Sequence, residues 1–362
     1  MRFSLLARLT LLAVVSQVSV ACGQATKHSS SARRMQPYQT EKFRLSAGPC
    51  AADGYFVMIH GASFINSQGG GFPVPSGHVL EGNWGASGTA WAVGDERQAV
   101  PEKLTANWFS YAEDKFYQGE FTLPQENIYQ LLKQGSWDLA KQKHVTYDEF
   151  TVCVLPKGVV VVWLTGGNQV LVGRYQAHEY TPSAADYARY YGDANRAEFV
   201  KTRRQQMPAH VQAEIKAGTL STRQWDNYLQ TYSWQVAFSV PFALYEYSVS
   251  FVNAERVSDP LSRDNLLAYR QYLLTPMEKP APRAGFFYGT AEHGGRYLVQ
   301  VRAFEEAETL AAFRTLHTAS PKSPITLLVT IDKPFQKATL TLQNEAKRIP
   351  LTKTAVQVLS ED

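Results

Sequence analysis

The chain has 362 residues, of which 44% are hydrophobic, 12% aromatic and 19% charged. This composition suits one large or two modest packed domains, and it excludes a disordered, coiled-coil or collagen-like protein. The 36 basic and 32 acidic residues give a formal net charge of +4. This near balance gives no electrostatic reason to expect a nucleic-acid partner.

The first residues carry a secretion signal. Two arginines precede an apolar run, Leu9–Val20, that is too short to span a membrane and ends in small residues. The sequence Ser19-Val20-Ala21-Cys22 resembles a bacterial lipobox, in which the cysteine is acylated and becomes the new N-terminus, although Leu or Val is usual where Ser19 stands. We therefore expect a signal peptide over residues 1–21 and lipidation at Cys22. Ordinary signal cleavage, which would give a soluble periplasmic protein, stays open.

A polar segment rich in Ser, Gln, Lys and Arg follows the lipobox. It is too polar to join a core, so we expect a lipidated N-terminus and flexible tether over residues 22–44. The residue after the cysteine is Gly23 and not the Asp typical of inner-membrane retention. The sequence thus predicts an outer-membrane lipoprotein that faces the periplasm and has the membrane as a partner through its lipid.

Three cysteines are present. If Cys22 carries lipid, Cys50 and Cys153 remain as an even pair in an oxidising compartment, which predicts a disulfide between them. In the loop-entropy model a bond that closes about 100 residues stabilises the fold by roughly 4–5 kcal/mol. Two buried free thiols are the alternative, because Cys153 lies in the apolar segment Phe150–Leu155.

Residues 45–275 are predicted to form a β-rich main domain. Short apolar or alternating runs separated by turn residues indicate strands, with hairpins at Glu113-Asp114 and Pro156–Gly158. A helix is expected between Pro124 and Gly135. The predicted strands are Tyr55–His60, Thr89–Val93, Leu104–Tyr111, Phe116–Leu123, Phe150–Leu155, Val159–Leu164, Gln169–Tyr175, Trp234–Val240 and Leu244–Val252.

Within this domain, residues 182–232 change to a helical period and predict a helical insertion. The run Lys201–Arg204 has three positive charges in four residues, which a solvated helix face explains better than a binding patch. Four helices are expected, with starts marked by Ser183, Asp193, Pro208 and Ser221.

A helix from about residue 261 to 274 ends the main domain. Three prolines and a glycine make residues 276–285 the clearest linker candidate. Residues 286–362 then alternate between strand and helix patterns and predict a small α+β unit. The predicted fold class is α+β: an antiparallel sheet-rich main domain with covering helices and a helical insertion, followed by the small α+β unit.

The sequence contains no recognisable catalytic signature. A Gly-x-Ser-x-Gly turn, a His pair one helical turn apart and a Cys-x-x-Cys motif are all absent. The glycine runs Gly69–Gly71 and Gly166–Gly167 are not followed by the Lys-Ser/Thr of a phosphate loop. We therefore expect no catalytic residue, metal or cofactor and a protein that is not an enzyme. An envelope hydrolase with an unrecognised site stays open.

The most distinctive stretch is Lys103–Pro124, KLTANWFSYAEDKFYQGEFTLP. It contains a Trp-bearing strand, a Glu-x-Lys-Phe-Tyr hairpin and a Leu-Pro helix start. Over about residues 55–259 the chain resembles an uncharacterised bacterial lipoprotein family, domain-of-unknown-function family 2931. It departs from the family pattern at Asn253-Ala254-Glu255, where Asn-Gly-Glu is expected. Further similar segments are Gly82-Asn83-Trp84-Gly85, Trp234 and Tyr247-Ser248-Val249.

The resemblance transfers no catalytic residue, but it suggests a partner. Genes of this family occur beside type VI secretion phospholipase effectors, which implies an envelope immunity protein that neutralises a toxic lipase. A structural lipoprotein of the cell envelope is the alternative. Aromatic residues and arginine commonly anchor interfaces, so the candidate contacts lie in the helical insertion, with core packing as the alternative for each. They are Tyr187, Arg189, Tyr190 and Trp225.

Overall fold

The computed structural model describes residues 35–90, 97–192, 195–260 and 276–361. Gln36–Asp362 forms one compact unit, and Met1–Met35 is assigned to a second. Several predicted features lie outside the described residues. They are the signal peptide, Cys22, most of the tether, the end of the strand predicted at 89–93, the Asp193 cap and the helix predicted over 261–274.

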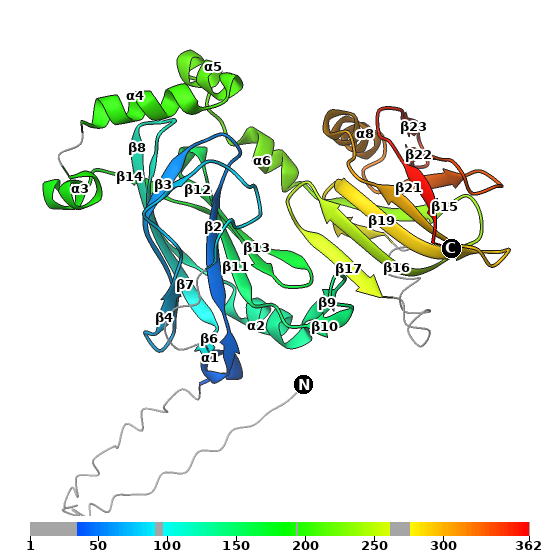
Figure 1. The fold of residues 1–362 in the computed structure, drawn as a ribbon, viewed down its shortest axis with the longest axis horizontal. Helices are drawn as coiled ribbons and strands as arrows, with labels where there is room; N and C mark the ends of the chain where they lie inside the picture. The colour runs from blue at the N-terminus through cyan, green and yellow to red at the C-terminus, as the bar shows by residue number, and fades with distance from the viewer. Residues whose placement is uncertain (1–34, 91–96, 193–194, 261–275, 362) are drawn as a thin grey trace, which may run out of the picture. The chain divides into compact units, whose positions relative to one another are not determined.

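The fold is α+β with mostly antiparallel sheets, as predicted (Figure 1). The largest sheet has nine strands, and only its β2–β11 pair is parallel. In sheet order the strands are Ser46–Ala51 (β2), Glu149–Leu155 (β11), Val159–Thr165 (β12), Gln169–Gln176 (β13), Arg256–Pro260 (β17), Phe242–Phe251 (β16), Pro282–Ala291 (β19), Arg296–Val301 (β20) and Gln357–Ser360 (β24).

Two further sheets have six and five strands. The six-stranded sheet consists of His178–Tyr180 (β14), Lys115–Thr122 (β8), Pro101–Ser110 (β7), Val57–Asn66 (β3), Gly71–Pro73 (β4) and Val79–Leu80 (β5). The five-stranded sheet consists of Met277–Lys279 (β18), Tyr232–Phe238 (β15), Ile325–Ile331 (β21), Ala338–Gln343 (β22) and Arg348–Leu351 (β23). Two-stranded pairs are formed by Lys42–Arg44 (β1) with Arg97–Ala99 (β6) and by Ser136–Asp138 (β9) with Lys143–Val145 (β10).

Several helices begin and end where local signals predict, but Asn195, and not the predicted Asp193, caps the helix that begins at Arg196. Pro124 and Gly135 flank one helix, and Ser183 Oγ accepts a hydrogen bond from the Asp186 backbone N–H at the start of the next. Gly218 ends a third in the left-handed region, with φ +68°. The described helices are Pro37–Thr40 (α1), Gln125–Gln134 (α2), Ala184–Tyr191 (α3), Arg196–Gln206 (α4), Ala209–Ala217 (α5), Arg223–Tyr228 (α6) and Glu306–Ala319 (α8).

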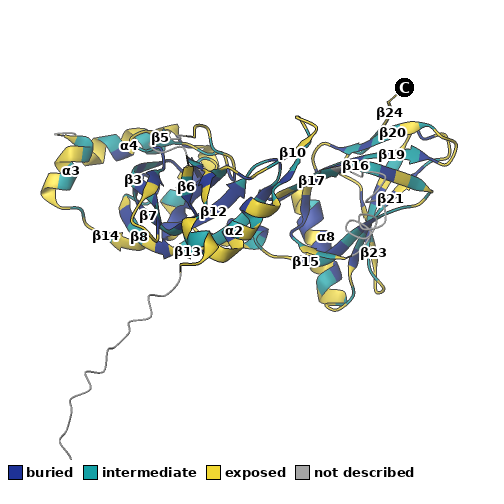
Figure 2. Cartoon of the chain, turned by 90° about the horizontal axis from the view of Figure 1, so that it is seen from below, coloured by how far each residue is buried: buried dark blue, intermediate teal, exposed yellow. Residues whose placement is uncertain are grey.

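Strands β11 and β12 separate two hydrophobic cores and are buried on both faces (Figure 2). Their continuous apolar runs are typical of strands covered on both sides. Val152 and Val162 face the core shared with the six-stranded sheet. Trp163 faces the other core, where its indole N–H donates to the Asn253 carbonyl at 2.9 Å and the Trp84 indole N–H donates to the Val252 carbonyl at 3.0 Å.

Residues 276–285, predicted as a linker, contribute strands instead. β18 pairs with β15, and β19 begins at Pro282 and pairs with both β16 and β20. A proline is tolerated at the first residue of a strand, and Ala281 just before it is fully buried. Residues 286–362 are not a separate unit either, because β21 pairs in parallel with β15 and β20 extends the nine-stranded sheet.

The folded region begins before residue 45, the predicted boundary of the tether. Helix α1 and strand β1 precede that position. Phe43 is buried, and its ring lies edge-on to that of Tyr129 in α2, with centroids 5.9 Å apart. Glu41 accepts a hydrogen bond from the Tyr129 hydroxyl and pairs with Lys133 at 2.8 Å. The boundary predicted at residue 44 is therefore too late, because Pro37–Thr40 and Lys42–Arg44 already belong to the folded unit.

Cys50 and Cys153 are both free and buried, so the predicted disulfide is not formed. The two residues nevertheless lie directly opposite each other on the parallel neighbours β2 and β11. Burial and then the neighbouring Cys50 raise the pKa of the Cys153 thiol well above its ordinary value. Cys153 is thus held as a protonated thiol in the core, and two buried free thiols are the alternative that its apolar surroundings favour.

Candidate functional site

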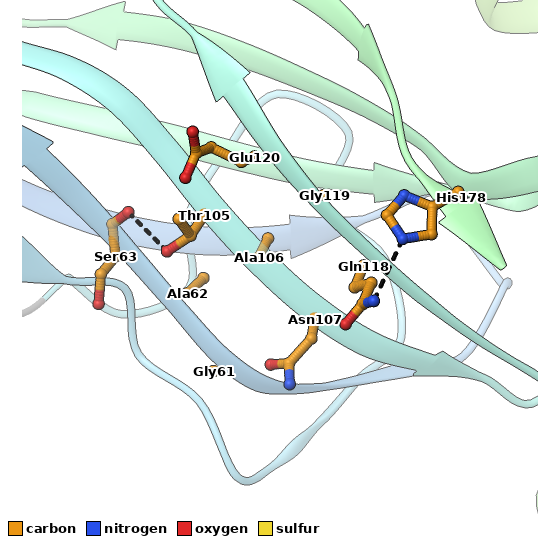
Figure 3. Close-up of a pocket in the computed structure, with 10 residues that line it drawn as sticks. All are labelled: Gly61, Ala62, Ser63, Thr105, Ala106, Asn107, Gln118, Gly119, Glu120 and His178. Carbon is orange, nitrogen blue, oxygen red and sulfur yellow. Dashed lines mark hydrogen bonds between the residues drawn. The ribbon is translucent and has the colours of Figure 1, made fainter. Parts of the chain in front are cut away.

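The outward face of the six-stranded sheet carries an open groove with a volume of about 530 Å³ (Figure 3). Alternation along the strands explains its composition, because every second side chain points into the core and those between point outward. The outward positions here are small or polar. We define the groove by its polar residues Ser63, Thr105, Asn107, Gln118, Glu120 and His178, with Gly61 and Gly119 between them.

The groove residues offer hydrogen-bond donors and acceptors from four adjacent strands. Gln118 Nε2 lies 3.1 Å from His178 Nε2 across the β8–β14 pair. Glu120 pairs with Lys103 at 2.7 Å. Among the described residues, no group of three or more His, Cys, Asp or Glu is placed to hold a metal ion. The groove can therefore engage polar groups along its length.

Helix α3 is attached to the sheet beside the groove through Tyr190. The Tyr190 ring stacks on the His60 ring of β3, with centroids 3.9 Å apart and planes at 11°. Its hydroxyl accepts hydrogen bonds from Asn107 Nδ2 at 3.1 Å and from an Arg189 guanidinium N–H at 2.9 Å. Asn107 of β7 therefore contacts α3 and also lines the groove, so one side chain connects the two.

His60 is neutral in this arrangement. Its Nε2 lies 2.9 Å from the Tyr191 hydroxyl, and its Nδ1 is buried with no hydrogen-bond partner among the described residues. Burial, followed by the positive charge of Arg189, lowers the pKa of His60 to about 4. A proton on His60 would thus be unfavourable beneath α3.

The four predicted contact residues do not form one surface. Arg189 is exposed, with 69% of its side chain accessible. Tyr187 and Tyr190 are half-buried on the same helix, where the Tyr187 ring packs against Phe116 of β8. Trp225 is only 4% exposed and lies edge-on to Tyr55 inside the hydrophobic core. The structure brings three of the four together on α3, while Trp225 is a core residue.

The basic residues of α4 fasten the β7–β8 hairpin. Arg196 Nε pairs with Asp114 Oδ1 at 2.7 Å. Arg204 donates to the backbone carbonyls of Tyr111 and Ala112 at 2.8 and 3.0 Å. Arg204 belongs to the basic run predicted as a solvated helix face, so that run also has a structural role.

Sequence reasoning missed His60, Asn107 and the groove itself. A signal was present, because the outward positions in the groove stretches of β3, β7 and β8 are small or polar, namely Gly61, Ser63, Thr105, Asn107, Gln118 and Glu120. That pattern identifies an uncovered sheet face. It does not identify the helix that borders the face.

No helix in the described part of the chain is both long and apolar enough to cross a membrane. The family model for proteins of unknown function, DUF2931, matches residues 27–223. Comparison with curated proteins and with solved structures finds no match. The matched range covers more than half of the chain and includes the groove, α3, α4 and α5. The chain therefore belongs to the DUF2931 family of proteins of unknown function.

Proposed function

We propose that this protein is a non-enzymatic binding protein of the cell envelope, lipidated at Cys22, that neutralises a type VI secretion phospholipase effector. The observation that carries the proposal is the open polar groove beside α3. The class of partner comes from the family resemblance. The lipobox-like sequence before Cys22 supports an outer-membrane position facing the periplasm.

A groove of this kind suits a loop of a partner protein. Ser63, Thr105 and Gln118 offer polar groups to a backbone laid across the sheet. Arg189 beside the groove is 3.8 Å from Asp186, and because both side chains are exposed it can exchange this contact for a carboxylate of the partner. Its guanidinium is already held by the Tyr190 hydroxyl at 2.9 Å and lies 4.9 Å from the centroid of that ring. A side chain positioned before binding loses less entropy when the complex forms.

The lipid would contribute to protection without contributing to affinity. An effector that attacks membrane phospholipid must work at the bilayer, and a tethered inhibitor is confined to the same layer. Confinement raises the effective concentration of the inhibitor there. We therefore expect the measured affinity to depend on the groove face and the protection of cells to depend on both the groove face and Cys22.

The groove is tested by Thr105→Arg, which places a large cation on its floor. Protein carrying this change is expected to bind the lipase encoded beside its gene at least about tenfold more weakly, or about 1.4 kcal/mol. Thr339→Arg is the matched control, because Thr339 is an exposed residue on β22 of another sheet. Equal loss of affinity in both variants, or in neither, contradicts the assignment of the groove.

The anchor is tested separately by Cys22→Ala with a soluble signal peptide. Affinity for the lipase is expected to be unchanged, while survival of cells that co-express the lipase is expected to fall. Deletion of residues 182–232 is not a usable test, because Val200, Val211 and Trp225 of that segment are buried in the core. If the wild type protects against no neighbouring lipase, the immunity function is wrong.

A further inference from the structure

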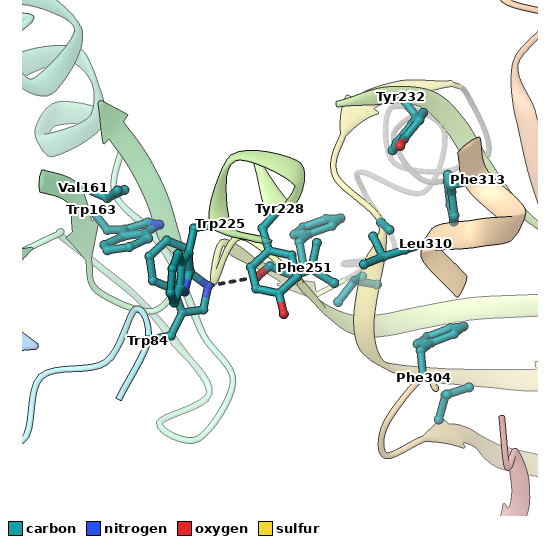
Figure 4. Close-up of a cluster of buried hydrophobic side chains, with 14 of the residues drawn as sticks. Trp84, Val161, Trp163, Trp225, Tyr228, Tyr232, Phe251, Phe304, Leu310 and Phe313 are labelled. Carbon is teal, nitrogen blue, oxygen red and sulfur yellow. Dashed lines mark hydrogen bonds between the residues drawn. The ribbon is translucent and has the colours of Figure 1, made fainter. Parts of the chain in front are cut away.

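A second hollow with a volume of about 300 Å³ lies apart from the groove. Its floor is aromatic and comes from distant parts of the chain: Tyr55, Trp84, Trp225 and Tyr228. Figure 4 shows Trp84, Trp225 and Tyr228 side by side in the hydrophobic cluster. Val252 completes the lining beneath them. We call this hollow the aromatic pocket.

The floor of the aromatic pocket is built before any ligand arrives. The Trp84 indole N–H donates to the Val252 carbonyl at 3.0 Å, and the Tyr55 hydroxyl donates to Glu214 at 2.7 Å. The Tyr228 hydroxyl donates to Glu306 Oε1 at 2.6 Å and accepts from Gln224 at the same distance. Because these groups already have partners, the floor keeps its shape when empty.

The mouth of the pocket carries both signs of charge. Asp53 and Glu306 supply carboxylates, while Arg283 and His210 supply a guanidinium and an imidazole. All four residues are exposed. Asp53 is fixed by hydrogen bonds from the backbone N–H groups of Asn83 and Trp84 to its Oδ1, at 2.6 and 3.1 Å.

The two carboxylates and the Arg283 guanidinium face one hollow without pairing with each other. Within the part of the chain that the structure describes, neither carboxylate forms an ion pair, and neither do Arg283 and His210. A ligand that covers the mouth excludes water from these groups, and opposite charges shielded from water attract one another more strongly than in bulk water. The mouth of the aromatic pocket thus presents unpaired acidic and basic side chains together. Such a mouth is complementary to a molecule that carries both a positive and a negative charge.

We propose that the aromatic pocket binds a small zwitterion. Its amine lies toward Asp53 and Glu306, its phosphate or carboxylate lies toward Arg283 and His210, and its carbon atoms rest on the aromatic floor. The guanidinium fork matches the oxygen atoms of either acid, and aromatic rings favour a neighbouring ammonium group. The volume lies at the small end of the range for ligand pockets, which fits a molecule the size of phosphoethanolamine.

This inference goes beyond the proposed function and does not depend on it. The pocket shares no lining residue with the groove. Its Arg283 and Glu306 also lie outside the matched family range. A zwitterion site would thus be a property of this chain, assembled from the matched segment and the residues after it.

Calorimetric titration of the purified protein with phosphoethanolamine tests the proposal. Phosphoethanolamine is expected to bind at least about tenfold more tightly than inorganic phosphate or ethanolamine alone. Arg283→Gln and Glu306→Gln should each weaken it by a similar factor. Glu306→Gln keeps an oxygen that can accept from Tyr228. Arg314→Gln is the matched control, since Arg314 is exposed on α8 away from the pocket lining.

Two further probes identify the source of the ligand. Serine tests a carboxylate in place of the phosphate. Cosedimentation with phosphatidylethanolamine vesicles, against phosphatidylglycerol vesicles, tests a lipid headgroup. Binding of either supports the proposal and assigns the source. The proposal is overturned if no zwitterion binds, or if the pocket variants bind as well as wild type. Thr105→Arg should leave the binding of phosphoethanolamine unchanged. A failure of the zwitterion proposal can therefore be told apart from a failure of the proposed partner site in the groove.

Discussion

Helices α3 and α8 both pack on sheets, but they are held in different ways. The described residues of α3 include no buried side chain, and ring stacking and hydrogen bonds to β3 and β7 hold this helix (Figure 2). A helix that packs only half-buried side chains on its sheet can open locally, whereas one inserted in the core opens only with the fold. In contrast, α8 buries Thr309, Leu310, Ala312, Phe313 and Leu316.

The largest effect is expected from Phe313→Ala in α8. The Phe313 ring is fully buried, with its centroid 5.2 Å from that of Tyr232 and 5.7 Å from that of Trp234. Removing it leaves a cavity that should cost about 3–5 kcal/mol of unfolding free energy, measured by urea denaturation. The corresponding change in α3, Tyr187→Ala, should cost much less because Tyr187 is half-buried. Equal costs would remove the distinction between the helices.

Acidification should loosen α3 and leave α8 in place. The pKa of His60 is lowered from 6.5 to about 4 in the folded protein, so the unfolded state binds more protons between these values. The stabilisation from neutral His60 is fully present above about pH 6.5 and is lost as the pH falls toward 4. After allowance for partial exposure we expect a loss of about 1–2 kcal/mol.

Amide hydrogen exchange of residues 184–191, compared at neutral pH and at about pH 4.5, measures this effect. The lower pH lies between the pKa of His60 in the unfolded protein, 6.5, and its pKa of about 4 in the folded protein. The quantity compared is the protection factor, which is the exchange rate corrected for the intrinsic effect of pH. His60→Gln should remove most of the pH dependence of the protection factors in α3. Exchange in α8 should respond much less in either protein. A pH response that persists in His60→Gln would assign it to other groups.

Ala254, which lies in neither helix, provides a reference value for these changes in unfolding free energy. Ala254, where the resemblance leads us to expect glycine, adopts a left-handed backbone with φ +66°. Relief of this strain by Ala254→Gly should raise the unfolding free energy by about 1 kcal/mol. Gly85→Ala is the opposite control, because its added Cβ would lie 2.0 Å from the Ala254 Cβ. A destabilising Ala254→Gly would contradict the expectation.

The smallest global effect is expected from Ser183→Ala. This change removes the N-terminal cap of α3, which is worth about 1 kcal/mol to a helix. Exchange within α3 should accelerate, while the urea midpoint of the whole protein stays nearly constant. Glu305→Ala removes the equivalent cap of α8, where Glu305 accepts from the Glu308 N–H at 2.6 Å, and should shift the midpoint.

Features with a local cause were predictable from the sequence. Gly135 ends its helix and Pro208 precedes the first residue of α5 as expected, and β12 begins at Val159, where its strand was predicted to begin. Pairings between distant segments were not predictable. Trp234 pairs with Ile325 in a parallel ladder, and nothing near either residue encodes that choice. The linker prediction failed for the same reason, since the prolines mark strand ends only once their neighbouring strands are known.

The candidate site was predictable only in part. The composition of α3 directed attention to Arg189, whose side chain is exposed and donates to the Tyr190 hydroxyl, and its role as a partner contact stays a prediction. The same reasoning selected Trp225, but a six-residue helix such as α6 has too few turns to reveal which face is buried. His60 gave no local signal, because its role depends on Tyr190 and Tyr191 from a helix far along the chain.

The indole hydrogen bonds of Trp84 and Trp163 show whether the segment matched by the family model can fold without the rest of the chain. Both tryptophans lie within residues 27–223, yet their acceptors are the carbonyls of Val252 and Asn253 beyond it. A fragment that ends at residue 223 would leave both indole N–H donors without their acceptors, at a cost of about 1–3 kcal/mol each. In this protein the recurring segment is thus not a transferable module, and a fusion or truncation must carry the following turn with it.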